Sequence, residues 1–407
     1  MSRFESFRAQ YPSLSRTHNG NTLVFMDGPG GTQVPQSVID AVSSYYKLSN
    51  ANAHGPFITS QETDVIIQGA RQRMSDFLGA EGPHTISFGS NMTTINFALS
   101  RAMSRVFQPG DEVLITQLDH ESNRGPWLAL RAQGIIVKEV RLLKNGYLDY
   151  EDLVKKVNDR TRLIAMGYGS NFMGTVNNIA IAREQAYRVG AWLLIDAVHY
   201  APHFPIDVMA LGCDFLLCSA YKFYGPHVGI LYSKPGLLDQ LPTDRLRTAP
   251  QTAPGSIETG TFNHAALAGV SAAVDEIAEL GEDHKDKRQE ILLGMQAIQA
   301  HERALLETLH QGLIEIPGVR IIGPDLADQR RTPTLAVVAK NQHPKDIPKA
   351  LAADNICAWN GHFYALRASE VLGLQEKGGV VRLGLSAYSN LDDVNRVIQS
   401  FQKIMKQ

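Results

Sequence analysis

The sequence predicts an α/β protein that combines a large domain, built on a mostly parallel central sheet flanked by helices, with a smaller α/β C-terminal domain. Short apolar runs alternate with helix-like stretches between residues 85 and 232, which is typical of a parallel sheet. Two of these runs, 192–195 and 215–217, are apolar on both faces, as central strands covered on both sides are. After about residue 264 the pattern changes to long helices followed by short strands.

The individual elements follow from these runs in chain order. Strands are expected at 85–88, 112–116, 135–140, 163–168, 191–195, 215–218 and 228–232, and helices between them at 94–105, 123–132, 149–157 and 179–189. Beyond residue 264, helices are expected at 265–280, 287–313 and 391–405, and strands at 320–322, 334–338, 356–358 and 380–385. The segment 242–260 is rich in Pro, Thr and Gly and is predicted to be a long loop, which is usually functional or at an interface.

Length and composition restrict the class of protein. The 407 residues suffice for two to three domains of roughly 100–200 residues, and 44% hydrophobic with 20% charged residues excludes a disordered or fibrous chain. The net charge of −2 gives no reason to expect nucleic acid or an anionic membrane as a partner. Three cysteines without CxxC spacing disfavour both a disulfide framework and a metal site. Because there is neither an apolar stretch long enough for a membrane span nor a signal-peptide pattern, we expect a soluble, cytoplasmic enzyme.

Two charged side chains stand at the ends of buried runs. Asp196 closes the run 191–195, and Lys222 closely follows the run 215–218, so both would lie at one edge of the sheet, where ligands bind. Taken alone, Asp196 could be a helix cap or a structural salt bridge, and Lys222 could reach solvent. Together they suit pyridoxal phosphate: the amine forms a Schiff base with the aldehyde, and the carboxylate keeps the pyridine nitrogen protonated.

Other segments suit the rest of that cofactor. Residues 89–93 follow a strand and precede a helix, whose first amides and dipole favour a phosphate dianion, although an ordinary capped loop is the alternative. His120 follows another strand and could stack on the cofactor ring or be a surface histidine. The segment DGPGGT at 27–32 lacks the GxGxxG spacing, so it is expected to be a turn near the site and not a dinucleotide fingerprint.

At this point the sequence resembles the class V aminotransferase family of fold-type I pyridoxal-phosphate enzymes, especially cysteine desulfurases and selenocysteine lyases. The similarity runs from about residue 22 to the C-terminus and is most specific at 192–232. It rests on the segments TLVFMDGPGGT, ITQLDHESNRGPW, GYGSNFMGT, LLIDAVHYAPHFPIDVMALGCDFLLCSAYKFYGPHVGILY, IETGTFN and VVRLGLSAYSNLDDVNRVIQSF. With it we expect the fold-type I transferase architecture, with a large domain at 23–285 and a small domain formed by 1–22 and 286–407.

The resemblance implies roles around the cofactor ring. Lys222 would be the Schiff-base lysine and Asp196 the partner of the pyridinium nitrogen. His120 would stack on the ring. Asn171 would donate a hydrogen bond to the phenolic oxygen and would also lie near the substrate. His199 stands near that oxygen, where the family usually has a glutamine.

The resemblance also implies how the phosphate and the substrate are held. Thr261 would reach the phosphate of the neighbouring subunit, which implies a homodimer with shared active sites. Arg382 would bind the α-carboxylate of an amino-acid substrate with its bidentate fork; a structural salt bridge is the alternative. The phosphate of the same subunit would meet Ser90, Asn91, Met92 and Ser219.

The sequence departs from the desulfurase pattern near the arginine. Desulfurases carry a nucleophilic cysteine there, after a Gly-His-His triplet. Here Gly361 and His362 match, the latter expected near the substrate, but Tyr364 takes the place of the cysteine. A phenol with a pKa of about 10 cannot carry a persulfide. Cys357 is expected to be a small packing residue, and Tyr221 replaces the usual histidine before the lysine, where it could still donate a hydrogen bond.

The sequence therefore predicts a pyridoxal-phosphate enzyme that acts at the α- or β-carbon of an amino acid, similar to desulfurases and selenocysteine lyases but without their cysteine. Elimination, epimerisation, transamination and selenol cleavage all stay open. The alternatives are a class V aminotransferase, an amino-acid epimerase similar to isopenicillin N epimerase, and a degenerate cofactor-binding regulator. The joint presence of Lys222, Asp196, His120 and Arg382 argues against the regulator, since a dead site has no physical need for that set.

Overall fold

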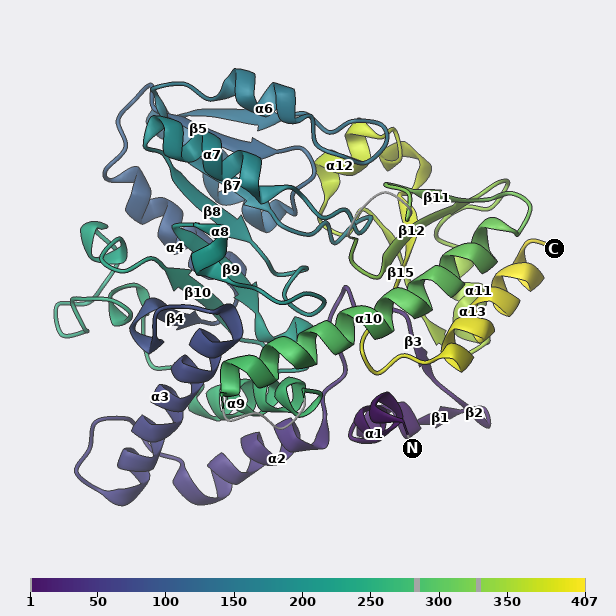
Figure 1. The fold of residues 1–407 in the computed structure, drawn as a ribbon, viewed down its shortest axis with the longest axis horizontal. Coiled ribbons are helices and arrows are strands. Elements are labelled where there is room, and N and C mark those ends of the chain that lie inside the picture. Colours follow the sequence, from purple (N-terminus) through teal and green to yellow (C-terminus); the bar gives the residue numbers. More distant parts are fainter. Residues whose placement is uncertain (1, 282–285, 327–330, 407) are drawn as a thin grey trace.

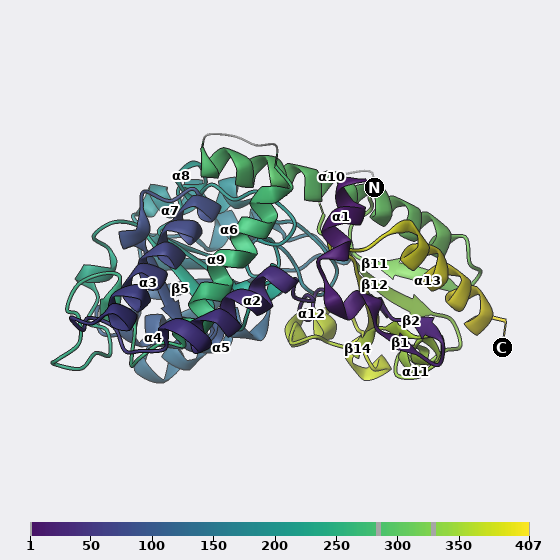
Figure 2. The ribbon, with the colours of Figure 1, turned by 90° about the horizontal axis from the view of Figure 1, so that it is seen from below.

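The computed structural model describes residues 2–281, 286–326 and 331–406. A seven-stranded sheet lies in one half of the molecule and a four-stranded sheet in the other (Figure 1). The long helix α10 (Lys287–Ile314) runs along both halves in the two perpendicular views (Figures 1 and 2). No helix of the described ranges is long and apolar enough to cross a membrane.

The seven-stranded sheet is mostly parallel, as predicted. Its order is β4-β10-β9-β8-β7-β5-β6. Strand β10 runs opposite to the other six strands, which are all parallel to one another. The predicted strands are confirmed to within two residues at each end. They are β4 (Ile86–Gly89), β5 (Glu112–Thr116), β6 (Ile136–Val140), β7 (Thr161–Gly167), β8 (Trp192–Asp196), β9 (Phe215–Ser219) and β10 (Gly229–Ser233).

Helices bury both faces of this sheet because its central strands are apolar on both sides. Leu193 and Ile195 of β8 belong to one apolar cluster, and Leu194 between them belongs to the other. One cluster packs under α3 (Ile58–Leu78), α7 (Ile179–Val189) and α9 (His264–Glu279), and the other under α4 (Met92–Ser104). The remaining helices of this half are α2 (Gln36–Ser44), α5 (Gly125–Leu128), α6 (Tyr150–Lys156) and α8 (Val208–Leu211).

The helix predicted at 123–132 is wrong in its extent. Only α5 is α-helical there, and 3-10 turns at Glu121–Asn123 and Ala129–Gln133 flank it. Pro126 explains the break, because it lacks the amide hydrogen that a continuous helix would need.

The second half is built on an antiparallel sheet of order β11-β12-β15-β14. The strand predicted at 356–358 is split: β13 (Ile356–Cys357) pairs in parallel with β3 (Val24–Phe25), and β14 (Trp359–Gly361) joins the sheet. The other elements are α1 (Arg3–Ala9), β1 (Thr17–His18), β2 (Asn21–Thr22), β11 (Val319–Ile322), β12 (Thr334–Ala339), α11 (Ile347–Ala353), α12 (Leu366–Val371), β15 (Val380–Gly384) and α13 (Leu391–Ile404).

The division into domains at 22/23 and 285/286 stays a prediction. Strand β3, just after the first border, pairs with β13 of the second half. The second border falls at residues 282–285, which lie outside the described residues.

The predicted loop at 242–260 has no helix or strand except a 3-10 turn at Gly255–Ile257. Its end is anchored by a buried ion pair. The carboxylate of Glu258 accepts two hydrogen bonds of 2.7 Å from Arg71 of α3, and a third of 2.8 Å from the amide of Phe88. Both charged side chains are buried, with exposed fractions of 8% for Arg71 and 6% for Glu258. The pair therefore fixes the segment that leads to Thr261.

Replacing Glu258 by alanine should lower the free energy of unfolding by about 3–5 kcal/mol, because Arg71 would be left buried without a counter-charge. Chemical denaturation followed by circular dichroism measures this. Asp275→Ala, which removes one partner of the half-exposed pair with Arg73, is the control and should cost only about 0–1 kcal/mol. A loss for Glu258→Ala no larger than that of the control would contradict the anchoring role.

Candidate active site

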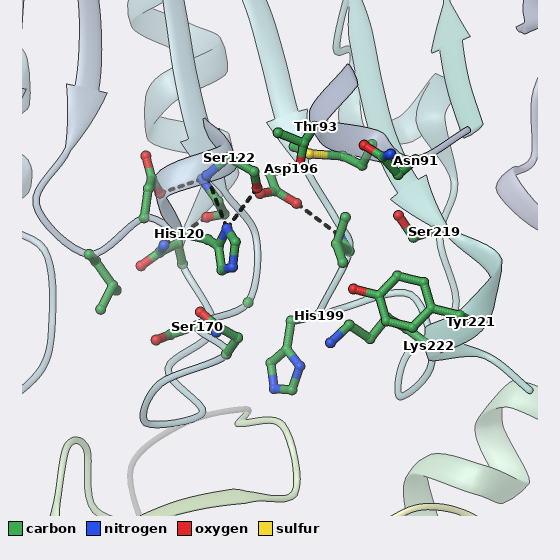
Figure 3. Close-up of a pocket in the computed structure, with 18 residues that line it drawn as sticks. Asn91, Thr93, His120, Ser122, Ser170, Asp196, His199, Ser219, Tyr221 and Lys222 are labelled. Carbon is green, nitrogen blue, oxygen red and sulfur yellow. Dashed lines mark hydrogen bonds between the residues drawn. The ribbon is translucent and has the colours of Figure 1, made fainter. Parts of the chain in front are cut away.

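The carboxyl ends of β5, β7, β8 and β9 surround an inner cavity (Figure 3). Strands β8 and β9 are parallel neighbours; Asp196 ends the first, and Lys222 closes the 3-10 turn that follows the second. Both side chains line this cavity. It is also lined by these other residues predicted from the sequence: Asn91, Met92, His120, Asn171, His199, Ser219 and Tyr221.

An outer cavity of about 1070 Å³ adjoins the inner one and shares Lys222, His120, Asn171 and Tyr221 with it. The residues predicted to face the substrate lie here: Arg382, His362 and Tyr364. Ser90 and Thr261 instead line a separate hollow beside the start of α4 and are not among the residues around the inner cavity.

Lys222 is buried, and its pKa is lowered so that protonated and neutral amine coexist near pH 7. Burial, followed by the charge of Arg382, lowers the pKa of Lys222 to about 7, against the opposing effect of Asp196 and Asp27. Its amine donates a hydrogen bond to the carbonyl of Pro29, in the turn at 27–32 that the sequence placed near the site. A large fraction of the amine is therefore unprotonated near neutral pH, which is the form that attacks a carbonyl carbon.

Asp196 is a buried carboxylate whose loss of hydration is only weakly offset by neighbouring groups. Its Oδ1 accepts a hydrogen bond of 3.0 Å from the amide of Val198. Burial, with a smaller contribution from the charge of Asp119, raises the pKa of Asp196 to about 7. A cationic group in the inner cavity would favour the ionised form. Asp119 also lines the cavity but was missed from the sequence, although it directly precedes His120.

His120 is a neutral imidazole in a fixed orientation. Burial, followed by the charges of Lys222 and Arg382, lowers the pKa of His120 to about 4. Its Nδ1 accepts a hydrogen bond of 3.0 Å from the amide of Ser122, so the proton is on Nε2. The ring centre lies 5.4 Å from that of Tyr364. An uncharged ring held in this way suits stacking on an aromatic ligand.

Arg382 has no carboxylate within ion-pair distance among the described residues. One guanidinium nitrogen donates a hydrogen bond of 2.9 Å to the backbone oxygen of Asn171. The guanidinium carbon lies 4.0 Å from the ring centre of Phe363. The side-chain amide of Asn171 donates a hydrogen bond of 2.8 Å to the backbone carbonyl of Phe363. Phe363 and Tyr364 both have left-handed backbone conformations, with φ of 52° and 58°, which non-glycine residues rarely adopt. This strained loop was missed from the sequence because no residue type there signals it.

Tyr221 lies against the lysine. The Lys222 amine is 4.9 Å from the centre of the Tyr221 ring, and this ring stacks on His227 with centres 4.7 Å apart. A Cβ atom on Gly31 would stand 3.2 Å from the Tyr221 ring, so glycine lets the turn at 27–32 approach the site.

The residues around the inner cavity fit pyridoxal phosphate. Two buried polar atoms that belong to its lining, Nδ1 of His199 and Oδ1 of Asn177, have no hydrogen-bond partner within the described ranges, which calls for a polar ligand. The side chain of Asn91 caps α4 by accepting a hydrogen bond of 2.8 Å from the amide of Thr94. The amides of Met92 and Thr93 at the start of α4 are then the ones left to meet a phosphate. The described chain holds no group of three or more His, Cys, Asp or Glu side chains placed to bind a metal ion.

Known proteins resemble this chain over nearly its whole length. Residues 24–397 match the family model described as aminotransferase class V. A cysteine desulfurase from Yersinia pseudotuberculosis is 31% identical, and the match covers 99% of this chain and 98% of that protein. Among solved structures, the apo form of a cysteine desulfurase from Thermococcus onnurineus has the same fold, with a TM-score of 0.89, 24% identity, and coverage of 100% and 99% of the two chains. A cysteine desulfurase from Escherichia coli has a TM-score of 0.86 and 26% identity, with the same coverage.

Proposed function

Because this chain belongs to the class V aminotransferase family, we propose that it binds pyridoxal phosphate at Lys222 and removes the α-proton of an amino acid without a cysteine persulfide carrier. The observation that carries the proposal is that Lys222 and Asp196 face one inner cavity from neighbouring parallel strands. The relatives indicate a pyridoxal-phosphate-dependent enzyme and leave the specific reaction open.

The lining of the two cavities supports a separate task for each group of the cofactor. Lys222 would hold its aldehyde carbon, Asp196 its ring nitrogen, and His120 one face of its ring. The first amides of α4 and the hydroxyl of Ser219 would meet its phosphate. When bound, the cofactor withdraws electrons from the α-carbon of an amino acid and so acidifies the α-proton.

The chain's own groups then handle the proton and the substrate. Lys222, whose pKa of about 7 lies near neutrality, accepts and returns a proton at Nζ. Arg382 offers its guanidinium to the substrate carboxylate in the outer cavity. The Phe363 ring lies against that guanidinium, and Arg382 is buried.

The structure supports a reaction without a protein persulfide. Tyr364, at the position of the desulfurase cysteine, has an exposed fraction of 68%. Cys357 is half-buried, and burial, followed by the charge of Asp27, raises the pKa of its thiol. Cys213 and Cys218 are buried, and burial raises the pKa of the Cys213 thiol to about 12. None of these thiols has the electropositive, accessible surroundings that generate a thiolate.

Wild-type protein incubated with ³⁵S-cysteine should therefore retain no label that a thiol reductant releases. Tyr364→Cys should gain such label, because it places a thiol on the exposed loop at the outer cavity. Non-reducing gel autoradiography measures both. Label on the wild-type protein that disappears in Cys357→Ser would show that Cys357 carries a persulfide and would overturn this part of the proposal.

Replacing Arg382 by glutamine should raise the KM for the amino acid about 30- to 100-fold, since one charge-assisted contact is worth roughly 2–3 kcal/mol. The visible absorption of the bound cofactor should stay unchanged. Rates of α-hydrogen exchange at increasing amino-acid concentration give the KM of each variant. Arg367→Gln on the surface of α12, where Arg367 pairs with Glu139 and Glu370, is the matched control. Equal KM values for the two variants would refute the assignment of Arg382.

A screen of L- and D-amino acids in deuterated water tests the proposal as a whole. At least one amino acid should exchange its α-hydrogen for deuterium in the presence of the holoenzyme, as NMR detects. The identity of the product formed distinguishes elimination, epimerisation and transamination. A protein that takes up no pyridoxal phosphate and exchanges no α-hydrogen would end the proposal.

We also propose that the enzyme is a cytoplasmic homodimer with shared active sites. Thr261 lies outside the inner cavity of its own chain, in a hollow with Ser90 near the start of α4. This placement is consistent with Thr261 serving the partner's phosphate, as the family resemblance implies.

A further inference from the structure

His199 presents an unused hydrogen-bonding atom to the inner cavity. It is 3% exposed, and its Nδ1 has no partner in the described part of the chain. His199 and Lys222 both line this cavity, and Figure 3 labels both. Lys222 nevertheless donates its hydrogen bond to the carbonyl of Pro29. The unpartnered nitrogen of His199 is therefore available to a ligand held in the cavity that Lys222 also lines.

The imidazole of His199 is neutral. Burial lowers the pKa of His199 well below its ordinary value, and the charges of His203, Lys222 and Arg382 act in the same direction, as does His120. His203 lies edge-on to it with ring centres 5.3 Å apart, and it is paired with the buried Glu302 at 2.9 Å. A neutral imidazole carries only one N–H, so the position of this proton decides whether Nδ1 donates or accepts.

Two threonines hold the other ring nitrogen. The Nε2 of His199 lies 3.1 Å from the hydroxyl of Thr332 and 3.0 Å from that of Thr334. Both threonines are fully buried. Thr334 begins β12 of the second half of the molecule, so the contact joins the antiparallel sheet to the end of β8.

The threonine segment is itself firmly held. Arg331 donates hydrogen bonds to the carbonyls of Met173 and Thr334, at 2.6 and 2.9 Å, and the amide of Thr332 donates 2.9 Å to the carbonyl of Gly174. A Cβ atom on Gly174 would lie 2.5 Å from the Thr334 carbonyl, so this close approach depends on glycine. The two hydroxyls are therefore fixed relative to His199.

The hydroxyl protons decide the tautomer. Within the described ranges, neither threonine hydroxyl has another acceptor besides Nε2. If Nε2 carried the imidazole proton, both hydroxyls would accept from it and their own buried protons would lack partners. If Nε2 is unprotonated, the hydroxyls donate to it, and the proton resides on Nδ1, facing the cavity.

We propose that Thr332 and Thr334 are positioning residues that lock His199 in the Nδ1–H tautomer. His199 is then an obligate donor to the atom that the family resemblance implies beside it, the phenolic oxygen of pyridoxal phosphate. This inference rests on the proposed function. It adds that Thr334, at the start of β12, and the preceding Thr332 set the electronic state of a cofactor held at the seven-stranded sheet. A donor that a tautomer change can abolish also distinguishes this site from one with an amide side chain, whose NH₂ always donates.

The optical test compares Thr332→Val/Thr334→Val, which removes both hydroxyls at constant shape, with Thr332→Ser/Thr334→Ser, which keeps them. The measured quantity is the pH midpoint of the visible band of the bound cofactor. A donor at the phenolic oxygen stabilises its negative charge and lowers this midpoint, so the valine variant should raise it by about 0.5–1 pH unit and the serine variant should restore it. A common midpoint for all three proteins would overturn the inference alone, whereas a wild-type protein without any band would overturn the proposed function with it.

A second measurement observes the tautomer in the wild-type apoprotein itself and needs no cofactor. Wild-type apoprotein with ¹⁵N-labelled histidine is examined by solid-state NMR, and the His199 signals are assigned by their absence in His199→Gln. The expected result is a protonated Nδ1 and an unprotonated Nε2. A protonated Nε2 in the wild-type protein would overturn the inference independently of any cofactor.

Discussion

Lys222→Ala should abolish the visible absorption band of bound pyridoxal phosphate and reduce the exchange of the substrate α-hydrogen by about 10³-fold or more. The variant loses both the amine that holds the aldehyde carbon and the base that moves the α-proton, and a positioned base alone contributes about 10²–10⁴-fold. Absorption spectroscopy and NMR-detected deuterium exchange measure the two losses. Lys234→Ala, which removes an exposed lysine paired with Asp214, is the control. An unchanged band in Lys222→Ala would contradict the assignment.

The same lysine predicts how cofactor uptake depends on pH. Burial, with Arg382, lowers the pKa of Lys222 to about 7, so the neutral amine is the minor form below this pH and the major form above it. The rate at which apoprotein takes up pyridoxal phosphate should rise about tenfold per pH unit below pH 7 and level off above it. Stopped-flow absorbance follows the uptake. A rate that continued to rise at that slope to pH 10 would show that the amine is not perturbed in this way.

Asp196→Ala should have the second largest effect, a loss of about 10²–10³-fold in α-hydrogen exchange, with the visible band retained at saturating cofactor. Removing one preorganised electrostatic partner of a reacting system typically costs this much. Asp196 is the acid whose side chain lines the inner cavity at the end of β8, and without it the ring nitrogen would lose its proton and withdraw fewer electrons.

Asp196→Glu is the matched variant for this test because it keeps the charge and changes only the reach of the side chain. It should retain more exchange activity than Asp196→Ala. Equal activities for wild type and Asp196→Ala under saturating cofactor would contradict the pairing of Asp196 with the ring.

Much of the fold follows from local pattern. The strands β8 and β9 are apolar on both faces, and this periodicity identifies central strands before any contact is known. The break at Pro126 was not anticipated because apolar spacing outweighed one proline in the prediction. Helices α2 and α3 were missed as well; α3 carries polar and charged side chains among its buried residues, such as Thr63 and Arg71, which weakens the apolar pattern.

The residues of the candidate site were also predicted only in part. Asp196 was found because it ends a buried strand, and Lys222 because it closely follows the neighbouring one. The parallel topology then places the ends of these two strands side by side. Thr332 and Thr334 were not found, since they lie more than 130 residues from His199 in the sequence and belong to no motif. Phe363 was missed because its contact with Arg382 depends on a left-handed backbone that no local residue type requires.

The most direct test of the central claim is to reduce the wild-type holoenzyme with borohydride, digest it, and map the pyridoxyl group by mass spectrometry. The account predicts a single modified peptide, with the group on Lys222. Modification of a different lysine, or a protein from which all cofactor dialyses away after reduction, would contradict it.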